Sequence, residues 1–138
     1  NTVIVSNGLA SMGIAVPGGL AADLAVEPNV VAATGDGGFL MNAAELETAT
    51  RVGCGFTVVL FVDDDYGLIS AKQREHRGAE FGTRLSNPDF VTFAESFGVA
   101  ARRPETRGDL VDAFEWAVGA GEMTLVEVPV VGTESRGG

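Results

Sequence analysis

The stretch from Val30 to Met41, "VVAATGDGGFLM", places one carboxylate, Asp36, among three glycines directly after an apolar run. Such a continuous apolar run is typical of a strand that is buried on both faces of a parallel sheet. Glycines let the backbone approach a ligand closely, and the start of a helix offers unpaired N–H groups to an anion. In open α/β sheets, ligands bind at the carboxyl ends of the strands. The stretch therefore predicts a ligand-binding turn at that edge.

A second acidic turn, "VDDDYG" from Val62 to Gly67, follows the next apolar run. Its three adjacent carboxylates repel one another, which is costly in a purely structural loop but favourable beside a divalent ion. A carboxylate such as Asp36 also repels a phosphate unless a cation lies between them. Each motif alone is more often an ordinary turn, but together they predict a hard cation such as Mg²⁺ bridging both turns to a phosphate group.

Short strand-like runs alternate with helical patterns along the rest of the chain. This alternation predicts an α/β fold, a doubly wound parallel sheet with helices on both faces. Strands are expected at 3–5, 29–33, 56–62, 99–102 and 124–128, and helices at 13–26, 39–52, 89–97 and 108–120.

The polar segment from Ser70 to Ser86 is predicted to be a loop that is functional or disordered. Its His76, the single histidine, is interpreted as a solvated residue in preference to an acid-base group. Asn87-Pro88-Asp89 is a helix start signal. Residues 1–131 are expected to form one domain, and residues 132–138 a flexible tail.

The composition excludes several classes of protein. With 46% hydrophobic residues in 138, the chain can bury a real core, and no apolar run or leader pattern suggests a membrane span or a signal peptide. A soluble, cytoplasmic protein is expected. Acidic residues outnumber basic ones 19 to 9, so the net charge of −10 disfavours nucleic acid and anionic membranes.

Two further compositional features concern the environment of the protein. Lys72 is the only lysine, and this scarcity among many acidic residues either aids solubility or indicates a halophilic cytoplasm. Cys54 is the only cysteine, which excludes an internal disulfide and is interpreted as a buried, inert thiol.

The segment "GDGGFLMNAAELETATRVGCGFTVVLFVDDDYGLI", Gly35 to Ile69, resembles the thiamin-diphosphate motif of acetolactate synthase-like enzymes. That motif runs from Gly-Asp-Gly, through a helix with Glu-Leu-x-Thr, to a strand that ends in an Asn-Asn or Asn-Asp pair. "SNGLASMGIAVPGGLAADLA", Ser6 to Ala25, also resembles this family, as do Glu80 to Val99 and Thr124 to Val130. The resemblance, which covers nearly the whole chain, is to the C-terminal cofactor domain of the catalytic subunit.

The resemblance implies specific roles for residues of both turns. Asp36 and Asp63 would be side-chain ligands of Mg²⁺, and the backbone carbonyl of Asp65 would complete the protein's share. Gly37 and Gly38 would donate their N–H groups to the diphosphate. The resemblance also includes Gly35, Tyr66 and Gly67 in the cofactor-binding turns.

The same resemblance implies an apolar wall around the reacting part of the cofactor. Met12 would support the bent cofactor, while its N–H group and the carbonyl of Ala10 would bind the aminopyrimidine edge. Leu68 and Ile69 would lie beside the thiazolium and the reacting carbon.

The implied activity is decarboxylation of a 2-oxo acid such as pyruvate, followed by ligation of the resulting enamine to a second carbonyl compound. From two pyruvates the product is 2-acetolactate, for branched-chain amino acid biosynthesis or for another pathway. The resemblance implies a homo-oligomeric parent enzyme, of which the chain would be an inactive fragment lacking the activating glutamate. FAD would bind outside this chain.

Three alternatives stay open at this point. Ser70 and Ala71 stand where acetolactate synthases often carry a tryptophan, so a related carboligase or decarboxylase is one alternative, and Trp116 is interpreted as a core residue. A non-catalytic phosphate-binding module lacks the expected glycine-rich and Walker motifs. The third alternative is a regulatory or assembly domain that has lost the cofactor, and the retained pair of Asp36 and Asp63 argues against it.

Overall fold

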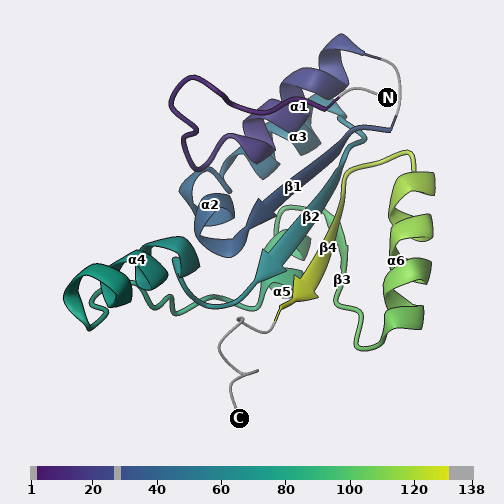
Figure 1. The fold of residues 1–138 in the computed structure, drawn as a ribbon. Coiled ribbons are helices and arrows are strands. Elements are labelled where there is room, and N and C mark those ends of the chain that lie inside the picture. The colour runs from purple at the N-terminus through teal and green to yellow at the C-terminus, as the bar shows by residue number, and fades with distance from the viewer. Residues whose placement is uncertain (1–2, 27–28, 131–138) are drawn as a thin grey trace.

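The computed structural model describes residues 3–26 and 29–130, which form a parallel four-stranded sheet with the strand order β1-β2-β4-β3 (Figure 1). Its strands are β1 Val31–Gly35, β2 Thr57–Val62, β3 Ala100–Arg102 and β4 Thr124–Pro129. Its helices are α1 Ala15–Ala25, α2 Asp36–Met41, α3 Glu45–Val52, α4 Gly67–Arg77, α5 Phe90–Glu95 and α6 Arg107–Gly119.

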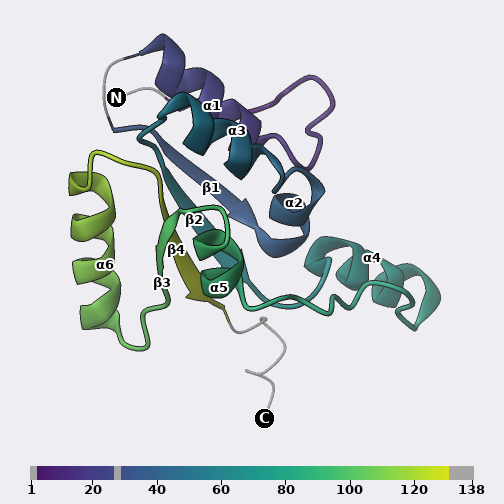
Figure 2. The ribbon, with the colours of Figure 1, turned by 180° about the vertical axis from the view of Figure 1, so that it is seen from behind.

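Helices cover both faces of the sheet, which confirms the predicted doubly wound α/β fold. The larger core cluster joins residues of α1, α3 and α5 to β1, β2 and β4, and Figure 2 shows α3 and α5 in front of the sheet. On the opposite face, Ala113 and Ala117 of α6 pack against Val126 of β4. The first four residues of β2 are all buried, as expected for a central parallel strand.

An aromatic cluster fixes the position of the glycine-rich turn. Phe39 of α2 is 1% exposed, and its ring lies 5.6 Å from that of Phe90 and 6.1 Å from that of Phe93, both edge-on. Phe97 extends the cluster through Phe93. These four phenylalanines belong to or pack against the larger core cluster, and they anchor the helix that begins at Asp36.

The predicted first strand is wrong. Val3, Ile4 and Val5 have no strand conformation and are 87%, 80% and 65% exposed, respectively. Their apolar and β-branched side chains favour a strand, but a strand forms only where a neighbouring strand pairs with it. In the described residues β1 pairs with β2 and has no second partner.

The predicted helix from Phe39 to Val52 is two helices. The first begins earlier, at Asp36, and ends at Met41, and the second begins at Glu45. Asn42 breaks the run: its φ and ψ are −137° and 28°, and its side-chain amide donates to the Gly13 carbonyl at 2.9 Å. A shared helical stripe of apolar residues could not reveal this interruption, because both helices face the same core.

The predicted loop from Ser70 to Ser86 is also wrong in its first half, which is helical. The helix α4 runs from Gly67 to Arg77 and is capped by Gly78, which has a φ of +70°. Basic residues in its last turn interact favourably with the negative end of the helix dipole. Ser70 is its fully buried residue, so the helix lacks an apolar stripe to reveal it. Figures 1 and 2 both show α4 projecting from the sheet.

The other predicted elements are present with shifted ends. α5 begins one residue after Asp89, whose side chain accepts from the Thr92 N–H group, and α6 begins with a capping box at Thr106. The predicted tail, 132–138, lies outside the described residues. Of the described helices, none has the length and apolar character that crossing a membrane requires.

Candidate functional site

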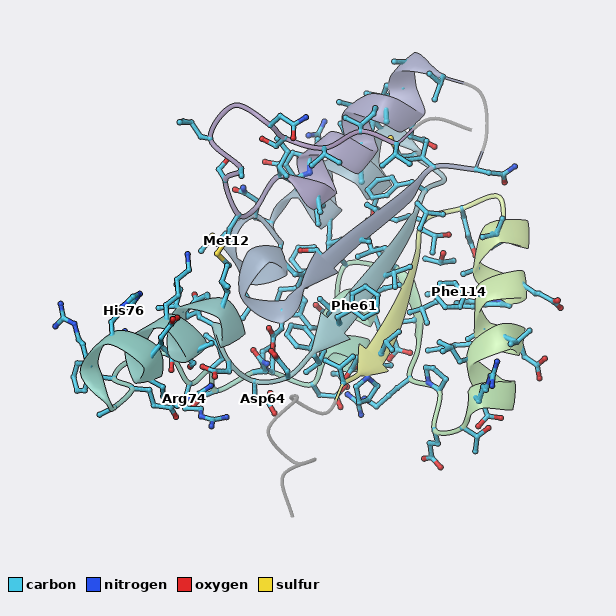
Figure 3. All side chains as sticks on the ribbon, in the orientation of Figure 1. Met12, Phe61, Asp64, Arg74, His76 and Phe114 are labelled. Carbon is cyan, nitrogen blue, oxygen red and sulfur yellow. The ribbon has the colours of Figure 1, made fainter. Side chains whose placement is uncertain are left out.

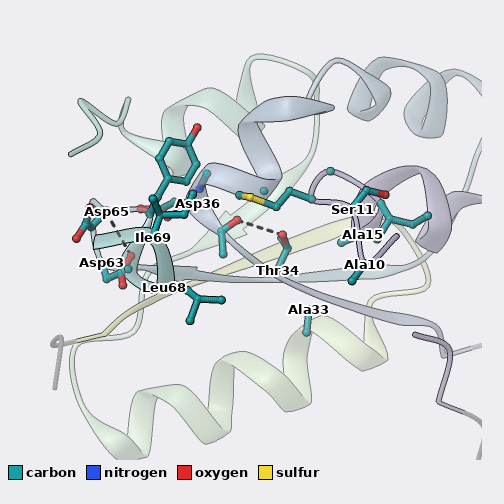
Figure 4. Close-up of a pocket in the computed structure, with 18 residues that line it drawn as sticks. Ala10, Ser11, Ala15, Ala33, Thr34, Asp36, Asp63, Asp65, Leu68 and Ile69 are labelled. Atoms are coloured by element: carbon teal, nitrogen blue, oxygen red, sulfur yellow. Dashed lines mark hydrogen bonds between the residues drawn. The ribbon is translucent and has the colours of Figure 1, made fainter. Parts of the chain in front are cut away.

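A pocket of about 470 Å³ lies at the carboxyl ends of β1 and β2 (Figure 4). Three separate segments line it: 10–15 leading into α1, 33–38 from the end of β1 into α2, and 63–69 from the turn after β2 into α4. It brings together every residue that the sequence nominated, namely Ala10, Met12, Gly35, Asp36, Gly37, Gly38, Asp63, Asp65, Tyr66, Gly67, Leu68 and Ile69. Their individual roles stay predictions.

Asp36 is a buried carboxylate that is bonded to neutral donors. It is 2% exposed; its Oδ1 accepts from the Gly37 N–H group at 2.8 Å, and its Oδ2 accepts from the Asp64 N–H group at 2.9 Å and from Asn87 Nδ2 at 2.7 Å. Within residues 3–26 and 29–130 it forms no ion pair. A buried charge is costly unless an opposite charge lies close to it, so this environment favours a cation.

Asp63 supplies a second carboxyl group to the same pocket. Partial burial raises the pKa of Asp63, and the nearby negative charge of Asp36 raises it further. The two turns therefore bring their carboxyl groups into one pocket, within electrostatic reach of one another. A divalent cation between them would reverse this repulsion.

Asp65 differs from Asp63 because hydroxyl groups surround its side chain. Burial raises the pKa of Asp65, but the hydroxyls of Ser70 and Thr83 together with the charges of Arg84 and Arg74 outweigh it, so the net shift is downward. The Ser70 hydroxyl lies 2.5 Å from Asp65 Oδ2. Asp65 Oδ1 is buried without a hydrogen-bond partner in the described part of the chain. This side chain is held within the protein, which leaves its backbone carbonyl as the group predicted to face a metal.

The segment Thr83–Asn87, here called the brace, holds the second acidic turn in place. The Tyr66 N–H group donates to the Thr83 carbonyl, and the Leu85 N–H group donates to the Asp64 carbonyl, each at 2.9 Å. These bonds support Asp64 in a left-handed conformation, with a φ of +58°. Our sequence analysis missed the brace, because it assigned these residues to a loop and to a helix start; no local pattern pairs 83–87 with 64–66.

The two glycines after Asp36 are required by the protein's own packing. A Cβ at Gly37 would lie 2.4 Å from Cε1 of Tyr66, and one at Gly38 would lie 2.9 Å from Oγ1 of Thr34. The Gly37 N–H group already donates to Asp36 Oδ1, so it can bind a diphosphate only by exchanging that bond.

The wall of the pocket away from the carboxylates is apolar and open. Met12 is 46%, Leu68 72% and Ile69 46% exposed, and Figure 3 shows Met12 in the segment before α1, facing the start of α4. Exposed apolar side chains around a concave site are typical of ligand pockets. His76 lies at the far end of α4, exposed and outside this pocket, on a helix instead of the predicted loop.

The donor set fits a hard cation. In the part of the chain that the structure describes, no group of three or more His, Cys, Asp or Glu side chains gathers as ready ligands. The pocket instead offers Asp36 and Asp63 with nearby carbonyl oxygens, and this all-oxygen set suits Mg²⁺, which keeps several water or phosphate ligands of its own.

Comparisons with known proteins agree with this geometry. The sequence profile described as "Thiamine pyrophosphate enzyme, C-terminal TPP binding domain" matches residues 1–128. The chain is 34% identical over 131 residues to an acetolactate synthase of Bacillus subtilis, covering 94% of this chain and 23% of that protein. It is 32% identical over 130 residues to a catabolic acetolactate synthase of Raoultella terrigena, covering 93% and 23% of the two chains.

A solved structure shows the same fold. It is a thiamine diphosphate-dependent 4-hydroxybenzoylformate decarboxylase of Rhodococcus jostii RHA1, with a TM-score of 0.86 and 26% sequence identity. The match covers 91% of this chain and 24% of that chain. The chain thus spans about a quarter of the length of the relatives that it matches.

Proposed function

The chain belongs to the thiamine pyrophosphate enzyme family, as its C-terminal TPP-binding domain, and we propose from this premise that its pocket holds thiamin diphosphate together with Mg²⁺. Asp36, Asp63 and the backbone carbonyl of Asp65 are the proposed metal ligands. The observation that carries the proposal is the 2% exposed Asp36 carboxylate, which shares the pocket with Asp63 and forms no ion pair among the described residues.

The residues of the glycine-rich turn are proposed to bind the diphosphate. Gly37 and Gly38 offer N–H groups at the start of α2, next to the proposed cation. The cation neutralises the charge that Asp36 would otherwise direct against the diphosphate. Gly35, Tyr66 and Gly67 line the same part of the pocket and shape it around the cofactor.

The apolar residues are proposed to orient the organic part of the cofactor. Met12 and Ala10 would bind its aminopyrimidine edge, while Leu68 and Ile69 would cover the reacting carbon and exclude water from it. Thiamin diphosphate, when bound, supplies the electron sink for cleaving the bond between the carboxylate and carbonyl carbons of a 2-oxo acid. The chain itself supplies position and electrostatics.

For the whole protein we propose an acetolactate synthase-type reaction, in which pyruvate or another 2-oxo acid is decarboxylated and joined to a second carbonyl compound. Support comes from the acetolactate synthases of B. subtilis and R. terrigena, which this chain resembles over most of its length. A homo-oligomer with the pocket near the subunit interface accords with the open, apolar wall around Leu68 and Ile69.

Calorimetric titration of thiamin diphosphate tests the proposal. Binding should occur with Mg²⁺, disappear with excess EDTA, and return when Mg²⁺ is added back. Two calorimetric arms, the 138 residues alone and the longer protein that contains them, separate a missing cofactor site from a site that needs another domain. Binding that is equally tight with EDTA would overturn the assignment of the metal ligands.

A decarboxylase that releases an aldehyde is the second candidate. Two observations favour it: the structural similarity to the R. jostii decarboxylase, and Ser70 and Ala71 in the segment where a tryptophan was expected. Ser70 is fully buried and bonded to Asp65 and Thr83, so it does not shape a substrate pocket. Product analysis with pyruvate distinguishes the candidates, since 2-acetolactate identifies the carboligase and acetaldehyde the decarboxylase.

A further inference from the structure

We propose that Asn87 is a positioning residue that ties the two acidic turns together and thereby sets the affinity of the pocket for its divalent cation. The inference rests on the proposed function and deepens it. Asn87 belongs to neither acidic turn, and it does not line the pocket. Its side chain nevertheless reaches both turns, one after β1 and one after β2.

The geometry of the Asn87 amide is unusual for a helix start signal. Its Nδ2 atom lies 2.7 Å from Asp36 Oδ2 and 2.7 Å from Asp64 Oδ1. An amide nitrogen has two hydrogens, so the two bonds use both of them. The opposite orientation would place the amide oxygen against two carboxylates, which fixes the amide with its nitrogen toward Asp36 and Asp64.

Both bonds end on side-chain carboxyl oxygens, one from each acidic turn. They also join residues that are far apart in sequence, 51 residues for the Asp36 bond and 23 for the Asp64 bond. The Asp64 N–H group donates to the same Asp36 oxygen, so Asn87, Asp64 and Asp36 form a closed triangle. A triangle of this kind restrains the separation of the two turns.

Asn87 is itself held from two sides. On one side, the brace fixes Leu85 to the Asp64 carbonyl. On the other, Phe90, three residues further along the chain, is 1% exposed in the core. Asn87 therefore transmits the position of the core to the acidic turns.

The consequence concerns how Asp36 presents its two oxygens. Oδ2 accepts from both Asn87 and Asp64, whereas Oδ1 accepts from Gly37 alone among the described residues. Oδ1 therefore keeps the greater capacity for a cation. Partners of this outer kind orient a ligating carboxylate, and their loss lowers metal affinity about 10–100-fold.

The test compares Asn87→Ala with Asp89→Ala in the whole protein. Asp89→Ala removes the α5 cap and the Arg103 pair two residues away, and it leaves the contacts of Asp36 intact. With thiamin diphosphate saturating, the Kd for Mg²⁺, measured by titration calorimetry, should rise about 10–100-fold for Asn87→Ala. For Asp89→Ala it should stay within about threefold of the parent.

A second measurement needs neither metal nor cofactor. The Asp64 N–H group should exchange with deuterium faster in Asn87→Ala than in the parent, because the triangle that protects it is broken, and Asp89→Ala should leave it unchanged. If the parent binds no Mg²⁺, the proposed function fails, but the exchange experiment still tests whether Asn87 holds the two acidic turns together.

The proposal is overturned if Asn87→Ala leaves the exchange rate of the Asp64 amide as in the parent, or if Asp89→Ala raises the Kd equally. Should Asn87→Ala fail to fold, Asn87→Ser keeps one hydroxyl donor and should show both effects in the same direction, at smaller size. An unchanged Kd and exchange rate in Asn87→Ser would then overturn the proposal.

Discussion

Two buried carboxylates, one directly after a strand and one within a strand of the same sheet, have opposite environments. Asp36, after β1, is 2% exposed, and Glu127, on β4, is 5% exposed. Glu127 Oε1 lies 2.7 Å from Nε of Arg103, which also pairs with Asp89. Asp36 is bonded to two backbone N–H groups and one amide and has no ion pair within the described residues.

Glu127 is a carboxylate with a structural role, whereas Asp36 is placed to bind a ligand. Arg103 is bonded to Glu127 and Asp89, and these bonds raise the pKa of its guanidinium. The positive charge of Arg103 is therefore compensated within the chain. Around Asp36, the neighbouring charge is the like charge of Asp63, which disfavours two ionised groups. A buried charge compensated within the chain stabilises the fold, whereas one that is not compensated favours a cation from solution.

The largest expected effect is on cofactor binding. Asp36→Asn should weaken Mg²⁺-dependent binding of thiamin diphosphate at least about 100-fold, because a neutral amide replaces the carboxylate that we propose as a metal ligand. Glu127→Gln, which also neutralises a buried carboxylate, should retain binding within about threefold. Titration calorimetry on both variants checks this. Equal losses in the two variants would break the distinction between the two carboxylates.

The next effect is on stability, and here the Glu127 variant, which should keep cofactor binding, is the one that loses. Glu127→Gln should lower the free energy of unfolding by about 1–3 kcal/mol, since Arg103 loses a charge-assisted bond in a site where Glu127 is buried. The Arg103 side chain is 39% exposed, and solvent screening places the loss toward the lower end. Urea unfolding without Mg²⁺ measures it, with the exposed Glu115→Gln as control; a loss as large in the control would contradict the prediction.

A smaller effect appears in acid. Bonds from the Thr92 N–H group and from Arg103 lower the pKa of Asp89 from 3.8 to about 2. A lowered pKa contributes stability that is present above the unfolded pKa and lost as the pH falls through the folded one, so this contribution disappears between about pH 4 and pH 2. Melting temperatures of the parent and Asp89→Asn should converge across that range, and a constant difference would count against the assignment.

The smallest expected effect concerns the contact between Arg102 of β3 and Trp116 of α6. The Arg102 guanidinium lies 4.0 Å from the ring centroid of Trp116, a cation–π contact on the α6 face. Arg102→Gln should lower the free energy of unfolding by no more than about 1 kcal/mol, because the contact is partly exposed. Trp116 fluorescence during urea unfolding reports it directly. A loss larger than that of Glu127→Gln would reverse the ranking.

Local sequence patterns placed both acidic turns in one pocket, because the carboxyl ends of neighbouring parallel strands meet at the same edge of a sheet. Trp116, interpreted as a core residue, is half-buried and packs against the cluster of Ala113, Ala117 and Val126. Cys54 is free and buried, as predicted, and burial together with Asp23 raises the pKa of its thiol.

Sequence patterns failed to predict elements that lack an apolar stripe or that depend on a partner distant in sequence. The helix α4 buries one small polar residue, Ser70, so hydrophobic periodicity gave no signal for it. The run Val3–Val5 has the composition of a strand, yet it is exposed and outside the sheet. Strand formation depends on pairing with a distant segment, which composition does not encode.

Residue type and spacing within single segments predicted the α/β class and the two acidic turns, whereas the other residues around the pocket followed from the resemblance to a known family. Only the folded chain shows that Asp36 has no cationic partner among the described residues while Glu127 has Arg103, and that Asn87 reaches both turns. The physical reason is that compensation of a buried charge depends on side chains that are distant in sequence and become neighbours only when the sheet forms.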